Sequence, residues 1–389
     1  MQHMMPSLGA LRLVLSIVLF LLGLLAVVKP PSYSFWKLSI IIMEGGHWLV
    51  LPLLLSAWLS FRSGQSGRIA GQIFLGAALL YSVTVIRAYA TAHKLELEFA
   101  ERWSNPSPPV NGFRRASTLS FLDLFRGIDH PKPVVTTYPY AKREGRELRL
   151  DFYPALGAAK PAPCVVLVHG GGWDGGARNQ LPDLNAWLSA EGYAVASLEY
   201  RLAPKDIYPA PVEDMRSALD WMRSHAGELG IDATRFVLMG RSAGGQIALQ
   251  AAYLRPDASI KGVIAFYAPA DMVFGYSLPT NPLIMDSRQL MVNYLGSKYE
   301  DKPEAYVASS PVEHLTATSP PTLILHGRAD VLVSYQHTVH MRAKLKPLGV
   351  KHFEVDLPWA AHGFDYVFRG PGSQISLYFI ERFLAEVTR

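Results

Sequence analysis

Apolar residues are concentrated at the beginning of the chain, in three long stretches that few charged residues interrupt. The stretches cover residues 8–28, 38–61 and 69–90, and a helix of about 20 apolar residues is long enough to cross the hydrocarbon core of a membrane. Arg12 lies near the start of the first stretch, where its long side chain can reach the headgroups. We therefore predict three membrane helices in an all-α region at residues 1–92.

The second stretch contains two ionisable residues, Glu44 and His47, which share one helical face because they are three positions apart. Ionisable groups inside a membrane are costly and usually face protein or water. Two interpretations are open: a polar lining beside a substrate path, or a hydrogen bond between helices that Gly45 and Gly46 allow to approach closely. We favour the second, and we expect Pro52 to kink this helix.

Basic residues beside the spans bear on the orientation of the protein. Three lie on the side of the first residues and the second loop, and five lie on the opposite side, which carries the rest of the chain: Lys29, Lys37, Arg87, Lys94 and Arg102. Because cytoplasmic segments carry more lysine and arginine, the count favours a multi-pass membrane protein with a cytoplasmic C-terminal domain.

From residue 134 onward, short apolar runs alternate with amphipathic stretches. Strands are expected at residues 148–153, 164–169, 194–199, 236–239, 262–267, 322–326 and 352–356. Helices are expected at residues 182–191, 212–226, 243–254, 335–348 and 373–387. This alternation predicts an α/β domain at residues 134–389, with a mostly parallel sheet and helices on both faces.

Residues 93–133 connect the two regions. We predict that they begin as a helical extension of the third span, continue as a proline-rich linker at residues 105–112, and include a short amphipathic helix at residues 119–125.

The composition narrows the possible functions. Charged residues make up 18% of the chain, against about 25% in a typical soluble domain, and the deficit lies in residues 1–90. No long basic run with interleaved aromatic residues occurs, so nucleic acid is not an expected partner. With Cys164 as the single cysteine, an intramolecular disulfide and a multi-cysteine metal site are excluded. No H-E-x-x-H pattern is present, and we expect neither a metal nor a cofactor.

The strongest chemical signal is the segment Gly240-Arg-Ser-Ala-Gly-Gly245, which follows an expected strand and opens an expected helix. A serine on such a tight turn needs small residues two positions away on either side, and Gly240 and Gly244 provide them. The helix that begins at Ala243 directs its positive end toward Ser242. We predict that Ser242 is a nucleophile.

A second glycine-rich segment, His169-Gly-Gly-Gly-Trp173, directly follows the buried strand that ends at residue 168. Consecutive glycines let the backbone turn two N–H groups toward a ligand. Together with the N–H of Ala243, these groups predict an oxyanion hole. The alternative is a phosphate-binding loop, which the lack of a P-loop lysine disfavours.

Two later segments supply the base and the acid that a serine nucleophile needs. Asp330 lies just beyond an expected strand, and His362 lies in the loop after the next one. The chain order Ser242, Asp330, His362 is the order in which α/β-hydrolases arrange a catalytic triad. Of the other histidines, we expect His169 and His326 to brace loops, and His337 and His340 to lie on a solvated helix face; His314 is the fallback base.

These segments resemble those of the hormone-sensitive-lipase-like branch of the α/β-hydrolases, a group of carboxylesterases and lipases. The resemblance rests on five motifs over about residues 134–389: 169–173, 199–204, 240–245, 326–330 and 362–364. It implies an α/β-hydrolase fold, ester hydrolysis through an acyl-enzyme, Gly171, Gly172 and Ala243 as oxyanion donors, and Trp173 and Phe364 beside the substrate. It also implies a bracing role for residues 199–204.

The sequence thus predicts a membrane-anchored serine carboxylesterase or lipase whose partners are the lipid bilayer and a lipophilic ester. The segment 271–299, rich in aromatic residues, methionine and proline, is a candidate for part of the acyl pocket. An acyltransferase or deacetylase that uses the same triad is the main alternative, and a non-catalytic membrane interaction module is a further one. Nothing in the sequence indicates an oligomeric state.

Overall fold

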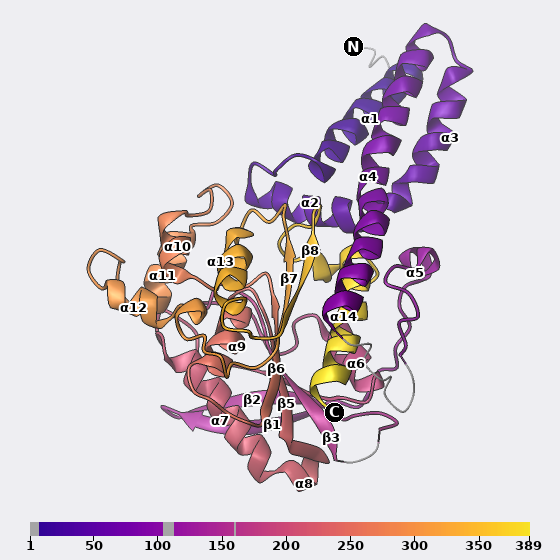
Figure 1. The fold of residues 1–389 in the computed structure, drawn as a ribbon. Coiled ribbons are helices and arrows are strands. Elements are labelled where there is room, and N and C mark those ends of the chain that lie inside the picture. The colour runs from indigo at the N-terminus through magenta and orange to yellow at the C-terminus, as the bar shows by residue number, and fades with distance from the viewer. Residues whose placement is uncertain (1–7, 104–112, 159–160) are drawn as a thin grey trace.

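The computed structural model describes residues 8–103, 113–158 and 161–389. An eight-stranded sheet lies at the centre of one part of the molecule, and a group of long apolar helices projects from it (Figure 1). The predicted linker at residues 105–112 lies outside the described residues.

The central sheet has the strand order β1-β2-β4-β3-β5-β6-β7-β8. The first two strands pair antiparallel, β2 pairs antiparallel with β4, and every later pairing is parallel. The strands are β1 (Thr136–Arg143), β2 (Arg146–Tyr153), β3 (Ala162–Val168), β4 (Ala194–Leu198), β5 (Ile231–Arg241), β6 (Ile260–Phe266), β7 (Thr322–Gly327) and β8 (His352–Leu357). The seven expected strands are confirmed, whereas β1 was not predicted, because this edge strand is mostly exposed and lacks an apolar run.

Apolar side chains project from both faces of the central strands. This explains why the sequence of these strands is a continuous run of hydrophobic residues. On β3, Cys164 and Val166 contribute to the core on one face, and Val165 and Leu167 contribute to the core on the other. The first core is covered by α7 (Ala210–Ser224), α9 (Ala243–Tyr253) and α13 (Gln336–Leu345). The second is covered by α6 (Pro182–Ala190) and α14 (Pro371–Val387).

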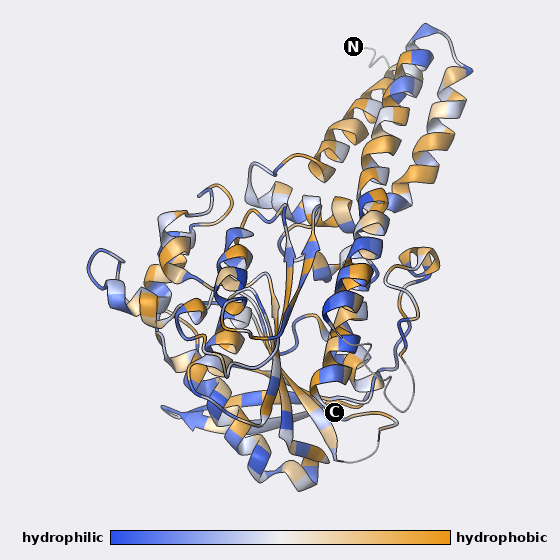
Figure 2. Cartoon of the chain, viewed as in Figure 1, coloured by the Kyte–Doolittle hydropathy of each residue, from blue (hydrophilic) through white to orange (hydrophobic). Residues whose placement is uncertain are grey.

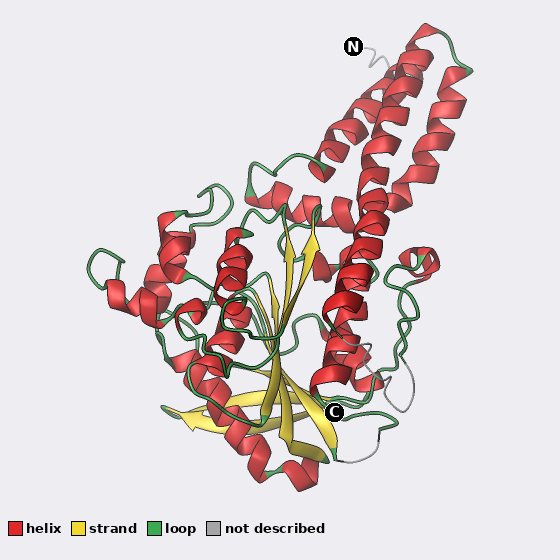
Figure 3. Cartoon of the chain, viewed as in Figure 1, coloured by secondary structure: helices red, strands yellow, loops and turns green. Residues whose placement is uncertain are grey.

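Shorter helices complete this domain, and Figure 3 shows them at its periphery, around the central sheet. They are α5 (Phe121–Arg126), α8 (Ala226–Leu229), α10 (Met272–Ser277), α11 (Ser287–Leu295) and α12 (Pro303–Ala308). The predicted amphipathic helix at residues 119–125 corresponds to α5, where Phe121 and Leu122 are exposed.

The N-terminal region has three apolar helical segments that are long enough to cross a membrane: Leu8–Ala26, Tyr33–Phe61 and Gln65–Arg102. Figure 2 shows that hydrophobic residues surround these helices on the outside as well as between them. Leu51, Leu79 and Leu11, for example, are more than half exposed. A water-soluble helix normally buries such residues on one face, so their exposure agrees with helices that could cross a membrane by length and composition.

The second segment differs from its expected form, because it is broken into two helices. Helix α2 (Tyr33–Gly45) ends at a 3₁₀ turn, Gly46–Leu49, after which α3 (Val50–Phe61) runs beside α4 (Gln65–Arg102). Helix α4 also packs against α1 (Leu8–Gly23). The break therefore precedes Pro52, which lies in the first turn of α3. A Cβ at Gly46 would come within 2.7 Å of the Tyr81 ring, so the turn packs closely against α4.

Helix α4 joins the two regions into one body. Its 38 residues include the predicted extension beyond the third span. Its C-terminal half packs on the sheet domain, where Phe99 contacts Phe353 and Phe379 with ring centroids 4.9 and 5.4 Å apart. Ala88, Ala92 and Leu95 belong to the same core as the residues of β8 and α14. The N-terminal helices are therefore fixed relative to the sheet.

Candidate active site

Ser242 lies at the turn between β5 and α9, in a backbone conformation that a side-chain-bearing residue rarely adopts. Its φ is 52° and its ψ is −122°. Strain of this kind is tolerated where the surrounding structure holds it, and here the Ser242 N–H donates to the carbonyl of Phe266 at 2.9 Å. The turn thereby places the serine at the carboxyl end of the parallel strands, where α/β sheets bind ligands.

The glycines around Ser242 are required by direct contact. A Cβ at Gly240 would lie 2.1 Å from the carbonyl oxygen of Gly244, and a Cβ at Gly244 would lie 2.3 Å from that of His169. Both distances are far below van der Waals contact, so the turn closes only with glycine at these positions. The predicted steric reason for the motif agrees with this geometry.

The second glycine-rich segment passes directly over the serine. A Cβ at Gly170 would lie 3.4 Å from the Ser242 Cβ. Gly171 and Gly172 have φ values of 131° and 61°, and neither of their N–H groups has a hydrogen-bond partner among the described residues. Two unpartnered donors beside a nucleophile are what an oxyanion hole provides.

The carboxylate of Asp330 and the imidazole of His362 are in contact. The His362 Nδ1 lies 2.7 Å from Asp330 Oδ2, and the other carboxylate oxygen accepts from the N–H groups of Leu332 and Val333 at 2.8 Å each. His326 Nε2 lies 3.3 Å from Asp330 Oδ2. These contacts fix the carboxylate, which in turn orients the His362 ring.

Asp330 remains ionised despite its burial. Burial alone would raise the pKa of this carboxyl, but the charge of His362 and the hydrogen bonds from His326 and His362 hold its pKa well below the ordinary value. An ionised carboxylate at this position stabilises a positive imidazole. The Asp330–His362 pair is thus suited to accepting a proton at the free ring nitrogen of His362.

A cavity of about 640 Å³ brings the predicted residues together. Its lining includes Ser242, Ala243, Asp330, His362 and the glycines at residues 170–172. Apolar residues of the segment 271–299 form another side, as the sequence suggested: Leu278, Pro279, Ile284, Met285, Leu290 and Met291. A mostly apolar cavity with a few convergent polar groups is typical of a small-molecule site. Among the described residues, no cluster of potential metal ligands occurs.

The two predicted substrate-binding residues differ in their positions. Trp173 lines the cavity, where its ring stacks on Tyr294 at 4.6 Å and its indole N–H donates to Gln246 at 3.0 Å. Phe364 is fully buried in the hydrophobic core, away from the cavity lining, so its assignment to the substrate was wrong. The error arose because the motif places Phe364 next to the histidine loop but does not indicate which way its ring points.

Two of the other histidines, His326 and His337, differ in their surroundings. His326 bonds Thr338 and the carbonyl of Val333, in agreement with a bracing role. His337 was expected on a solvated face but is only 4% exposed; it accepts from the N–H of Asp271, and burial lowers its pKa to about 3. The prediction failed because the segment around α10 covers α13, a contact that helical spacing cannot reveal.

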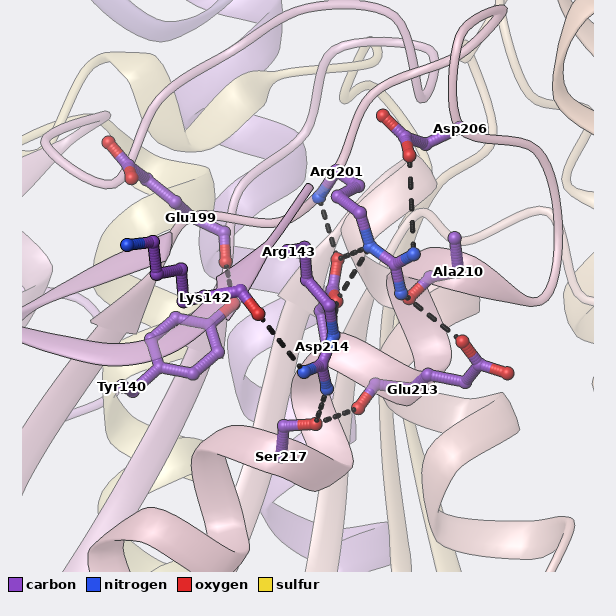
Figure 4. Close-up of polar contacts among 10 residues, drawn as sticks. All are labelled: Tyr140, Lys142, Arg143, Glu199, Arg201, Asp206, Ala210, Glu213, Asp214 and Ser217. Carbon is purple, nitrogen blue, oxygen red and sulfur yellow. Dashed lines mark hydrogen bonds and ion pairs between the residues drawn. The ribbon is translucent and has the colours of Figure 1, made fainter. Parts of the chain in front are cut away.

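A network of ion pairs braces the segment 199–204, as the family resemblance implies. Arg201 bonds the fully buried Asp214 through its backbone N–H at 2.8 Å and through its guanidinium Nε at 2.9 and 3.0 Å, and the carbonyl of Glu199 accepts from Tyr140 (Figure 4). Arg143, from the unpredicted strand β1, donates to Ser217 on α7 in the same network. This segment therefore holds the edge of the sheet to α7 and does not line the cavity.

A second buried network, which the sequence did not reveal, connects the serine turn to the histidine loop. Arg241, next to Ser242, is paired with Asp365, which also accepts from the hydroxyl of Tyr267. The Tyr267 ring lies against His362 with 4.3 Å between ring centroids. Sequence reasoning had no signal for this contact, because the two charged residues are 124 positions apart.

Comparison with known proteins supports the fold and the class of reaction. Residues 150–345, half of the chain, match the family BD-FAE. The chain belongs to the BD-FAE family. It is similar to two Mycobacterium tuberculosis proteins: the probable carboxylic ester hydrolase LipM, at 28% identity over 62% of this chain and 59% of LipM, and the esterase LipC, at 27% identity over 80% of this chain and 86% of LipC.

Solved structures show the same fold. A bacterial heroin esterase, 22% identical, superimposes with a TM-score of 0.57 over 66% of this chain and 84% of its own. The likeness and the sheet order confirm the predicted α/β-hydrolase fold with an N-terminal helical region. The narrower placement in the hormone-sensitive-lipase-like branch stays a prediction.

Proposed function

We propose that this chain is a membrane-anchored serine carboxylesterase, with Ser242, Asp330 and His362 as its catalytic triad. The observation that carries the proposal is that all three residues line one cavity, with His362 held by the ionised Asp330 at 2.7 Å. The esterase names of LipM and LipC support the same reaction class.

The reaction would proceed in two steps. The Ser242 Oγ attacks the ester carbonyl carbon while His362 accepts the hydroxyl proton, and the N–H groups of Gly171, Gly172 and Ala243 receive the developing oxyanion. His362 then gives the proton to the departing alcohol, which leaves an acyl-enzyme on Ser242. Water, deprotonated by His362, attacks the carbonyl carbon of this ester; His362 then returns the proton to the departing Ser242 oxygen, which releases the acid and restores the serine hydroxyl. Asp330 keeps the imidazole orientation through both steps.

The preference for lipophilic esters follows from the surroundings of the site. The 271–299 side of the cavity is mostly apolar, and the helices beside it carry an exposed apolar surface that suits a bilayer. An ester that partitions into the membrane would be concentrated near the enzyme. The anchor thus raises the effective substrate concentration without changing the chemistry.

The test uses the full chain in nanodiscs with esters of increasing acyl length and a fluorophosphonate probe. We expect turnover and labelling by the wild type, and a loss of at least about 10⁴-fold in kcat, with no labelling, for Ser242→Ala. Ser277→Ala serves as the matched control, because this serine is exposed, lies outside the cavity lining and donates its hydroxyl to the carbonyl of Phe274. Equal turnover by wild type and Ser242→Ala would reject the proposal.

A further inference from the structure

Helix α2 belongs by sequence to the second apolar segment, yet it contacts the loop that carries His362. The indole N–H of Trp36, on the first turn of α2, donates to the backbone carbonyl of His362 at 3.2 Å. The two rings also lie near each other, with centroids 6.4 Å apart. Trp36 is only 9% exposed, so this hydrogen bond is shielded from water. A residue from the N-terminal region therefore holds the backbone of the proposed catalytic base.

The other end of α2 is fixed to the same loop and to the first turn of α14. The fully buried carboxylate of Glu44 accepts from the indole of Trp359 at 3.2 Å and from the N–H of Gly372 at 2.8 Å. A Cβ at Gly370 would lie 2.6 Å from Glu44 Oε2, so the chain leaves space for the carboxylate. Glu44 thus bonds the sheet domain, and neither interpretation made from the sequence, a substrate path or a contact between membrane helices, describes it.

The start of α2 also forms one side of the cavity. Lys29, Pro30, Tyr33 and Trp36 are part of its lining. The backbone N–H of Tyr33 donates to the carbonyl of Leu283 at 3.1 Å, which joins the start of α2 to the loop between α10 and α11. A substrate at Ser242 would therefore lie between the sheet domain and a helix of the N-terminal region.

We propose that α2 is part of the active site. Its Trp36 positions the loop that carries His362 and also forms a wall of the substrate pocket. The inference rests on the proposed function, since it assumes that Ser242 and His362 catalyse ester hydrolysis. The two roles use different atoms of Trp36. The N–H positions the base and governs kcat, whereas the ring limits the space beside the ester and governs the choice of acyl group.

Two substitutions separate these roles. Trp36→Phe keeps an aromatic wall but removes the donor, so we expect kcat to fall about fivefold on every ester, as for the loss of one hydrogen bond, with KM nearly unchanged. Trp36→Ala also removes the wall, so we expect the ratio of kcat/KM for a dodecanoyl ester to that for an acetyl ester to rise about tenfold. Trp58→Ala is the matched control, because Trp58 is in the same apolar segment but half exposed and contacts Arg62.

The measurements use the full chain in nanodiscs, with fluorophosphonate labelling as a check on Ser242. Trp36 variants that label normally and turn over both esters within twofold of the wild type would overturn the inference and leave the proposed function standing. An equal loss of kcat/KM on both esters for Trp36→Ala would refute the proposal that the Trp36 ring forms a wall of the pocket. If Trp36→Ala fails to fold, Trp36→Phe alone tests the positioning role. A wild type that neither labels nor turns over ester would reject the proposed function itself.

Discussion

The buried ion pair between Arg241 and Asp365 gives the sharpest prediction about stability. Both side chains are at most 7% exposed, and Asp365 is the carboxylate that faces the Arg241 guanidinium. Replacing Asp365 with Asn keeps the shape of the side chain but leaves Arg241 as a buried charge without a counterion. Removing one partner of a buried pair costs about 3–5 kcal/mol. Tyr267 can still donate to the amide oxygen, so the loss arises mainly from the charge.

This cost converts to a large change in melting temperature. For a domain of this size, each kcal/mol corresponds to about 2–4 °C in Tm, so Asp365→Asn should lower Tm by about 10 °C. The assay is tryptophan fluorescence during heating in detergent at one fixed scan rate, because unfolding of such a protein is expected to be irreversible. We also expect kcat to fall, since Arg241 adjoins Ser242 and Asp365 follows His362 by three positions.

Two controls isolate the charge. Asp356→Asn breaks a pair with Arg328, whose side chain is 56% exposed, and an exposed pair contributes at most about 1 kcal/mol. The double variant Arg241→Met with Asp365→Leu removes both buried charges and should recover most of the lost stability. If Asp365→Asn melts within about 2 °C of the wild type, or if the double variant is as unstable as the single one, the reasoning is refuted.

Two further predictions concern the serine turn and the effect of acid. Gly244→Ala should abolish ester turnover, because the added Cβ would collide with two backbone carbonyls. Gly227→Ala is the control: a Cβ at this position would have no atom within 4 Å, so this variant should keep wild-type activity. Equal activities of the two variants would contradict the prediction. Burial lowers the pKa of His169 to about 4 and of His337 to about 3, while the unfolded chain binds these protons below about pH 6.5. Stability should therefore fall as the pH drops from 6.5 to 4, and less steeply in His337→Asn; identical Tm profiles would contradict it.

Local physical requirements made much of this protein predictable from its sequence. Strands buried on both faces read as apolar runs, and the elbow needs glycine at residues 240 and 244 for steric reasons that act within a few residues. Parallel strands bring their carboxyl ends to one edge of the sheet. Because Ser242, Asp330 and His362 each follow an expected strand, the sequence predicted that the three residues lie close together. The proposed triad and oxyanion loop required no knowledge of distant contacts.

Features that depend on contacts between distant segments were decided only by the tertiary structure. The apolar character of residues 38–61 indicated a span, but not that α2 would turn aside and bond the His362 loop through Trp36 and Glu44. Phe364 and His337 were misjudged for the same reason, because their burial is set by α14 and by the segment around α10. Periodicity tells which face of an element is apolar, whereas the partner of that face, and of each buried charge, is fixed only when the whole chain packs.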